Sequence, residues 1–131
     1  MSVIRLGSGG PWEEAFGYSR IVVAGPNAYV SGCTAVIGGI VHHEGDPYRQ
    51  AQTAFDVALT ALKEAGFGRS DVVRTRMYVV HPRDMEEVGR AHKELFDTAR
   101  PAATMVVVSK LIDPEMLVEV EIEAYRDGSA P

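Results

Sequence analysis

Apolar residues recur at two distinct spacings along the chain, and each spacing predicts a different kind of element. Between residues 47 and 65 they return every three or four positions, which is the period of a helix with one buried face. Asp46 suits the N-cap, Pro47 the first helical position and Gly66 the C-terminal end. We therefore expect a helix of about 18 residues here. Its apolar positions are Ala51, Ala54, Phe55, Ala58, Leu59 and Leu62.

A second helix is expected after Pro82, where the helical period returns. Asp84 and Glu87 have the spacing of a capping box, which predicts the start of the helix. His92 lies within the apolar stripe, so we favour a packed histidine that is bonded to a neighbour. The stripe consists of Met85, Val88, His92, Leu95 and Phe96.

Shorter apolar runs separated by turn residues predict strands. Residues 20–32 are expected to form a hairpin around Gly25-Pro26-Asn27, and Gly38-Gly39 marks a second turn. Further strands are expected at residues 3–6, 72–80, 103–108 and 117–125. Five or six strands and two helices predict an α/β (α+β) fold, in which both helices cover one face of a mixed sheet.

The two longest strands predict that the other face of the sheet is polar. In residues 72–80, one face is expected to carry Val72, Arg74, Arg76 and Tyr78, and the other Val73, Thr75, Met77 and Val79. In residues 117–125, Glu119, Glu121 and Glu123 alternate with Val118, Val120, Ile122 and Ala124. Either solvent or other subunits would cover such a face.

Length and charge narrow the class of protein. The 131 residues suit a single domain over residues 1–131, with a frayed tail at residues 127–131. Acidic residues outnumber basic ones by 18 to 13, which disfavours nucleic-acid binding despite the local pair Arg74 and Arg76. One cysteine allows no internal disulfide, and we see neither a signal peptide nor an apolar run long enough to span a membrane. A cytoplasmic location is expected.

Structural roles are favoured for the His42–Asp46 cluster and for Cys33, although their side chains could be reactive. His42, His43, Glu44 and Asp46 match no usual zinc spacing, so a solvated turn is favoured over a metal site. Cys33 follows a predicted strand without the partners of a nucleophile, so a buried, small side chain is favoured.

The acidic strand has two interpretations that the residues leave open. Glu119, Glu121 and Glu123 share one face of a strand, and Arg74 and Arg76 have the same spacing on another. If that face is buried, a carboxylate needs an arginine or its pKa rises, and a carboxylate facing an arginine in a cleft would hold water beside a bound anion. A solvated charge ladder explains the same pattern.

From about residue 15 to residue 125, the chain resembles the YjgF/RidA family. The order and spacing of several weak motifs carry the resemblance. They are Gly17-Tyr18-Ser19-Arg20, Tyr29-Val30-Ser31-Gly32, the helix at residues 50–66, the strand at residues 71–79, Arg100-Pro101-Ala102-Ala103-Thr104 and Leu117-Val118-Glu119-Val120-Glu121.

The resemblance implies a chorismate-mutase-like fold and a homotrimer with a central barrel and ligand clefts between subunits. It implies an enamine/imine deaminase, a hydrolase that releases ammonia and a keto acid from substrates such as 2-aminoacrylate without a metal or organic cofactor. In that chemistry an arginine holds the substrate carboxylate and a glutamate assists the attacking water. Glu119 matches the glutamate. Tyr18, Gly32 and the backbone of Met105 match ligand-contacting positions, and His92 stands where the archetype has tyrosine.

The chain departs from the family pattern at the arginine. Ala103 stands in its place, and alanine cannot grip a carboxylate. Arg100 lies an odd number of residues away and is expected to face the other way, so Arg76 is the better replacement. Two hypotheses follow: an imine or enamine hydrolase that does not favour 2-aminoacrylate, and a non-catalytic trimer that binds a metabolite. RNA cleavage, which is also associated with the family, ranks last because the chain is acidic.

Overall fold

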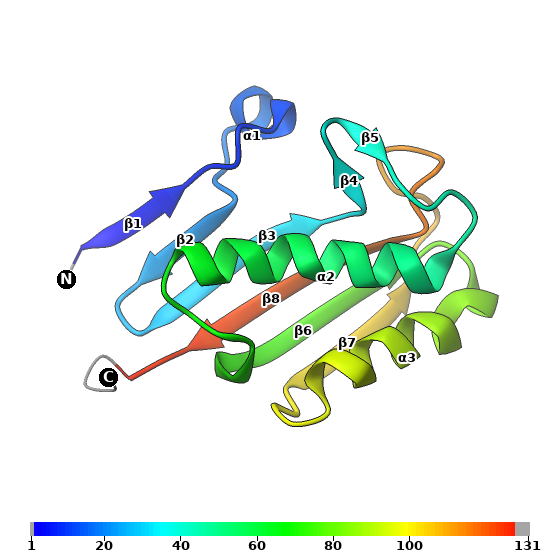
Figure 1. The fold of residues 1–131 in the computed structure, drawn as a ribbon. Helices are drawn as coiled ribbons and strands as arrows, with labels where there is room; N and C mark the ends of the chain where they lie inside the picture. The colour runs from blue at the N-terminus through cyan, green and yellow to red at the C-terminus, as the bar shows by residue number, and fades with distance from the viewer. Residues whose placement is uncertain (1, 128–131) are drawn as a thin grey trace.

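A six-stranded mixed sheet forms the centre of the protein, and the computed structural model describes residues 2–127 of it. The strand order is β1-β2-β3-β8-β6-β7, and only β6 and β7 run parallel (Figure 1). These strands are β1 (Val3–Leu6), β2 (Ile21–Ala24), β3 (Asn27–Cys33), β6 (Val72–Val79), β7 (Ala102–Val107) and β8 (Val118–Tyr125). The short strands β4 (Val36–Ile37) and β5 (Ile40–Val41) form a separate hairpin around the predicted Gly38-Gly39 turn.

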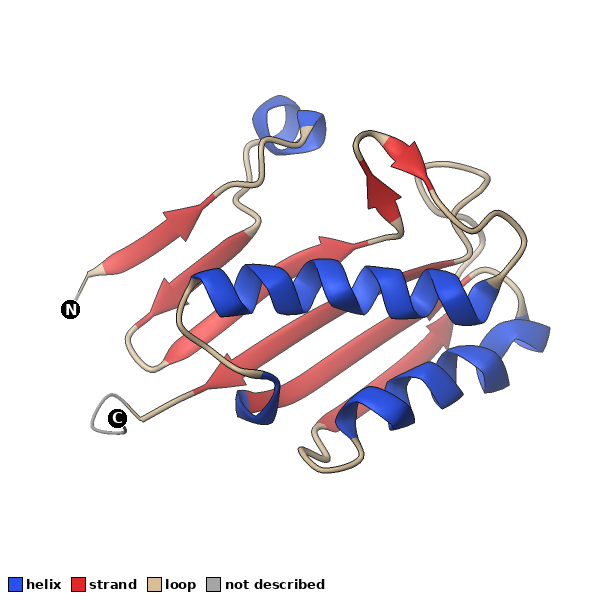
Figure 2. Cartoon of the chain, viewed as in Figure 1, coloured by secondary structure: helices blue, strands red, loops and turns tan. Residues whose placement is uncertain are grey.

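Two helices cover one face of this sheet, as the sequence predicts (Figure 2). They are α2 (Pro47–Glu64) and α3 (Met85–Phe96), and α3 connects the parallel strands β6 and β7. The Asp46 side chain caps α2 by accepting the backbone N–H of Arg49 at 3.0 Å. Gly66 takes a φ of 91° just after α2, a conformation that glycine adopts without strain. Two 3-10 turns, η1 (Arg69–Asp71) and η2 (Pro82–Asp84), precede β6 and α3.

The core lies between the helices and the sheet. Phe55 and Leu62 from α2 and Phe96 from α3 are fully buried against β8 and β6. The apolar face of β8 is buried as predicted, with Val118, Val120, Ile122 and Ala124 directed toward the helices. The three glutamates of β8 therefore lie on the face that no helix covers.

The predicted faces of β6 are wrong at its first residues. Between Val72 and Arg74 the strand advances two residues, while its partner β8 advances only from Ala124 to Glu123. This bulge makes Val73 the extra residue, which is 50% exposed, and turns Val72 into the core. From Arg74 onward the predicted alternation holds.

Two further predictions about local structure need correction. Asp84 and Glu87 form no capping box, because Asp84 ends the η2 turn with a helical backbone and its side chain caps nothing. The glycine-rich stretch before Pro11 was expected to open no helix, but the six-residue helix α1 (Pro11–Phe16) begins there, and so short a helix gives little signal in the sequence. The predicted fraying of the tail falls mainly on residues 128–131, which lie outside the described residues. Within residues 2–127, no helix is both long and apolar enough to cross a membrane.

Candidate functional site

A bulge in β3 opens the sheet beside the acidic strand. Val30 pairs with Ile122 and Cys33 pairs with Val120, so two residues of β3, Ser31 and Gly32, stand opposite a single residue of β8. Bulges of this kind bend a strand and redirect the groups around them, and they are common next to functional sites. Here the bulge brings the backbone of β3 against the side chain of Glu119.

Gly32 is the residue that permits this close approach. A Cβ atom at Gly32 would lie 2.2 Å from Oε2 of Glu119 and 2.9 Å from its Cδ. Any side chain at this position would therefore displace the carboxylate. Glycine therefore leaves the space that the Glu119 carboxylate occupies.

The three glutamates of β8 differ in their partners. The Tyr78 hydroxyl donates to the Glu121 carboxylate, and Nη1 of Arg76 binds Oε2 of Glu123 at 2.6 Å. Among the described residues, none forms a hydrogen bond or ion pair with the Glu119 carboxylate. Glu121 and Glu123 therefore have partners, as a charge ladder would require, but the Glu119 carboxylate has none within residues 2–127 and is free to bind a ligand or water.

The surroundings of Glu119 disfavour its charge. Burial raises the pKa of Glu119, the negative charge of Glu121 raises it further, and the positive charge of Arg20 acts in the opposite direction. A carboxyl group whose pKa rises toward neutrality is better able to accept and return a proton near physiological pH.

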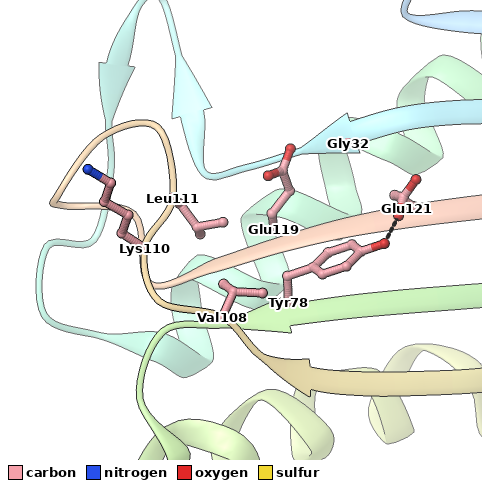
Figure 3. Close-up of a pocket in the computed structure, with 7 residues that line it drawn as sticks. All are labelled: Gly32, Tyr78, Val108, Lys110, Leu111, Glu119 and Glu121. Carbon is pink, nitrogen blue, oxygen red and sulfur yellow. Dashed lines mark hydrogen bonds between the residues drawn. The ribbon is translucent and has the colours of Figure 1, made fainter.

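A cavity of about 330 Å³ lies over this face of the sheet, and the Glu119 side chain lines it. Figure 3 shows the Glu119 carboxylate beside β3 at Gly32 and the Lys110 ammonium directed away from it. Lys110 is exposed and is the single basic residue among those that line the cavity. The lining residues are Gly32, Tyr78, Val108, Lys110, Leu111, Glu119 and Glu121.

Five of the predicted site residues form two groups in a single chain. Gly32 and Glu119 line the cavity together, whereas His92, Ala103 and Met105 lie on α3 and β7. His92 faces the helix side of the sheet, where its Nε2 lies 2.8 Å from Oγ1 of Thr75, and burial lowers its pKa. Met105 packs against the core beside α3, and Ala103 is exposed on the edge strand β7.

The remaining predicted residues have other partners. Arg76 is paired with Glu123, and Arg100 binds Oδ1 of Asp97 at 2.6 Å with an exposed side chain. Tyr18 is partly exposed, and the Arg20 guanidinium lies 5.9 Å from its ring centroid.

Sequence reasoning missed Arg20, Tyr78 as a partner of Glu121, and Lys110. The residue types gave no signal, because their roles depend on the bulge and on the loop after β7. A second cavity, of about 570 Å³, lies between α2 and the strands β1, β2 and β4, and Arg20 borders it. It contains none of the predicted site residues.

The structure gives simple outcomes for the other reactive side chains. Cys33 is buried as predicted, and burial raises the pKa of its thiol to about 11, so the thiol stays protonated. Across residues 2–127, the structure brings no three His, Cys, Asp or Glu side chains into position to hold a metal ion.

The mixed sheet, the two helices on one face and the glutamate beside a bulge define an α/β protein of the YjgF type. A solved member of the YjgF/YER057c/UK114 family from Mycobacterium tuberculosis superposes with a TM-score of 0.88 at 39% identity, over 95% of this chain and 100% of that one. This agreement confirms the predicted chorismate-mutase-like fold.

The model of the family described as Endoribonuclease L-PSP matches residues 12–126, so the chain belongs to this family, which includes the YjgF/RidA proteins. An uncharacterized protein of Streptomyces coelicolor is 51% identical over 125 residues, which are 95% of this chain and 93% of that protein. The RutC family protein UK114 of Drosophila melanogaster is 31% identical over 105 residues, which cover 79% of this chain and 75% of that protein.

Proposed function

We propose that this protein is a hydrolase of small imines, enamines or related electrophiles, and that Glu119 activates the attacking water. One observation carries the proposal: an unpartnered, half-buried carboxylate lies against Gly32 and lines a cavity sized for a small metabolite. Such a group can take a proton from water without first breaking an ion pair. The family resemblance supports the same reaction class.

The reaction needs one water molecule and proton transfers, and an enamine reacts after it has tautomerised to the imine. Glu119 takes a proton from water as the oxygen attacks the carbon of the C=N bond, and it passes that proton to the nitrogen to give a carbinolamine. A second transfer, from the carbinolamine hydroxyl through Glu119 to the nitrogen, breaks the C–N bond. The products are a carbonyl compound and ammonia, so water balances the reaction and nothing is oxidised or reduced. Acid–base assistance of this kind contributes about 10²–10⁴-fold.

The proposal includes a cytoplasmic homotrimer with the cleft between subunits. Its support is the separation of the two groups of predicted residues: a neighbouring subunit would bring Ala103 and the β7 edge to the Glu119 cavity. The exposed side chains Val106 and Val107 on that edge also favour burial by another subunit. Light scattering on the purified protein should give three times the 14.2 kDa chain mass. A monomer at micromolar concentration would contradict the trimer.

The substrate is expected to lack a carboxylate. Ala103 provides no cation, and the Lys110 ammonium points away from Glu119 (Figure 3). Arg76 and Arg100 are already paired with carboxylates. Without a guanidinium grip, 2-aminoacrylate should be turned over poorly, and neutral imines should be preferred.

Ala103→Arg should increase turnover of 2-aminoacrylate over that of wild type, because it restores a planar cation at the position where the family places one. Ala102→Arg is the matched control. Ala102 lies beside Arg74 and Ala103 beside Thr75, so adjacent side chains of β7 point to opposite faces. Ammonia release from 2-aminoacrylate measures both variants. Equal effects of the two substitutions, or efficient turnover by wild type, would show that another group holds the carboxylate.

The whole proposal is tested by ammonia release from a panel of neutral and carboxylate-bearing imines. If no member of the panel is hydrolysed faster than in buffer, the proposal that the protein is a hydrolase is wrong. Binding of a panel member without turnover would then favour the non-catalytic metabolite-binding trimer. RNA as a substrate ranks last because the net charge is −5, and salt-sensitive RNA binding would reverse that order.

A further inference from the structure

The Arg20 guanidinium binds the same β3 bulge that lies against Glu119. Its Nη1 donates to the carbonyl oxygen of Gly32 at 2.7 Å and to that of Ser31 at 3.3 Å, and it lies 3.3 Å from Sγ of Cys33. These acceptors belong to the stretch where the pairing of β3 with β8 shifts. A charged donor therefore stabilises backbone that the regular ladder does not hold.

Glu13 holds Arg20 in place. Oε2 of Glu13 lies 3.5 Å from Nε of Arg20, and the two side chains are 8% and 14% exposed. Glu13 also accepts the backbone N–H of Ser8 at 2.9 Å and the Ser8 hydroxyl. Burial alone would raise the pKa of Glu13, but the bonds from Ser8 and the charge of Arg20 together lower it, so the carboxylate stays ionised.

The backbone around Arg20 is tied to the same bulge. The N–H of Ser31 donates to the carbonyl oxygen of Arg20 at 2.9 Å, and the Ser31 hydroxyl donates to that of Ser19 at 2.6 Å. We call the side chains of Ser8, Glu13 and Arg20 the Arg20 clamp. The clamp thus fixes the bulge, and the same bulge lies against Glu119.

We propose that Arg20 is a positioning residue for the reaction: it fixes the Gly32 bulge against which the Glu119 carboxylate lies, and its charge balances that carboxylate. The proposal rests on the proposed function for its catalytic meaning. Its structural content, a chain of contacts that runs from Arg20 through the Gly32 backbone to the Glu119 carboxylate, stands on the geometry.

The charges around Glu119 make Arg20 the important cation. On β8, Glu121 opposes ionisation of Glu119, and on β3 the Cys33 thiol is neutral. On β6, the Tyr78 hydroxyl is engaged with Glu121. Lys110, on the loop after β7, directs its ammonium away (Figure 3). Arg20 is the group whose positive charge lowers the pKa of Glu119 against burial and repulsion.

A purely structural ion pair predicts a different result from a positioning pair. If the clamp only anchors the N-terminal segment, its loss lowers stability and leaves the titration of Glu119 unchanged. If Arg20 acts on Glu119, its loss raises the midpoint of that titration. The low-pH limb of the rate profile then moves to higher pH by the same amount, because the ionised carboxylate is the active form.

The experiment is an NMR titration of the full-length protein with ¹³C-labelled glutamate side chains, with Glu119→Gln to identify the Glu119 resonance. Arg20→Met should raise the midpoint. Because this variant leaves the buried Glu13 carboxylate without its cation, Glu13→Gln/Arg20→Met is measured beside it. The Glu119 midpoint should be raised in the double variant as well. Glu13→Gln alone retains the Arg20 charge and should not raise it, and Arg90→Met removes a remote surface arginine as a control.

Arg20→Lys separates the two parts of the proposal. It retains the charge but loses the planar fork, so the midpoint should stay close to that of wild type while kcat falls. An unchanged Glu119 midpoint in the folded Glu13→Gln/Arg20→Met variant overturns the inference, even if the protein hydrolyses imines. A raised midpoint supports the coupling even if no imine is hydrolysed, so failure of the proposed function is recognised separately.

Discussion

Glu119→Gln should abolish most of the turnover, with kcat for the best imine substrate falling by about 10²–10⁴-fold. The amide preserves the size and shape of the side chain but cannot accept a proton from water. The low-pH limb of the rate profile, which follows ionisation of Glu119, should disappear together with the activity. The measurement is kcat from ammonia release across the pH range, with circular dichroism to establish that the fold is intact.

Glu123→Gln is the matched control, because Glu123 lies on the same face of β8 and is partly exposed. Its carboxylate already binds Arg76, so it is not available for proton transfer. The control should retain activity close to that of wild type. If Glu119→Gln retains its turnover, or if both substitutions reduce it equally, the assignment of Glu119 as the base is wrong.

Glu119→Gln should not reduce the stability of the protein. Folding raises the pKa of Glu119, so the folded protein binds this proton more tightly than the unfolded chain. The stabilisation that this preference provides is present below the unfolded pKa and is lost as pH rises through the folded pKa. At about pH 8 Glu119→Gln should therefore have a Tm equal to or above that of wild type. A carboxylate whose ionisation lowers stability fits a functional role.

The sequence predicts best those elements in which the apolar period continues over many residues and recognisable residues mark the ends. Eighteen residues of α2 repeat the apolar spacing, and Asp46 and Gly66 mark its ends. The start of β6 was predicted wrongly because Val72 and Val73 are both apolar, so either can face the core. Only pairing with β8 inserts the extra residue that decides the phase. Alternation within one strand does not contain that information.

The candidate site divides in the same way. Glu119 and Gly32 were selected by the resemblance, and the structure places them in contact, although their role stays a prediction. Arg20 was not selected, because its acceptors are 11 to 13 residues away on a bulge that no local pattern indicates. For His92, in contrast, a local pattern was sufficient. Its place on the apolar stripe of α3 correctly predicts a packed side chain, here bonded to Thr75.

Gly32→Ala should reduce turnover nearly as far as Glu119→Gln, with little change in stability. The added Cβ would meet Oε2 of Glu119 at 2.2 Å, and the carboxylate is the free end of a flexible side chain that can rotate away. We therefore expect a stability change of less than about 1 kcal/mol and a Glu119 carboxylate turned out of the reactive position. Gly89→Ala is the control, since its Cβ would meet only Cε of Met105 at 3.9 Å.

The double variant Gly32→Ala/Glu119→Gln tests whether the methyl group acts through the carboxylate. If it does, the double variant should be as slow as Glu119→Gln alone, because no catalytic carboxylate is left for the methyl group to displace. If instead the methyl group blocks the substrate directly, the two losses should multiply and KM should rise with the methyl group in either background. Measured kcat and KM for the four proteins decide between the two causes, and multiplying losses would show that Gly32 provides room for the substrate rather than for Glu119.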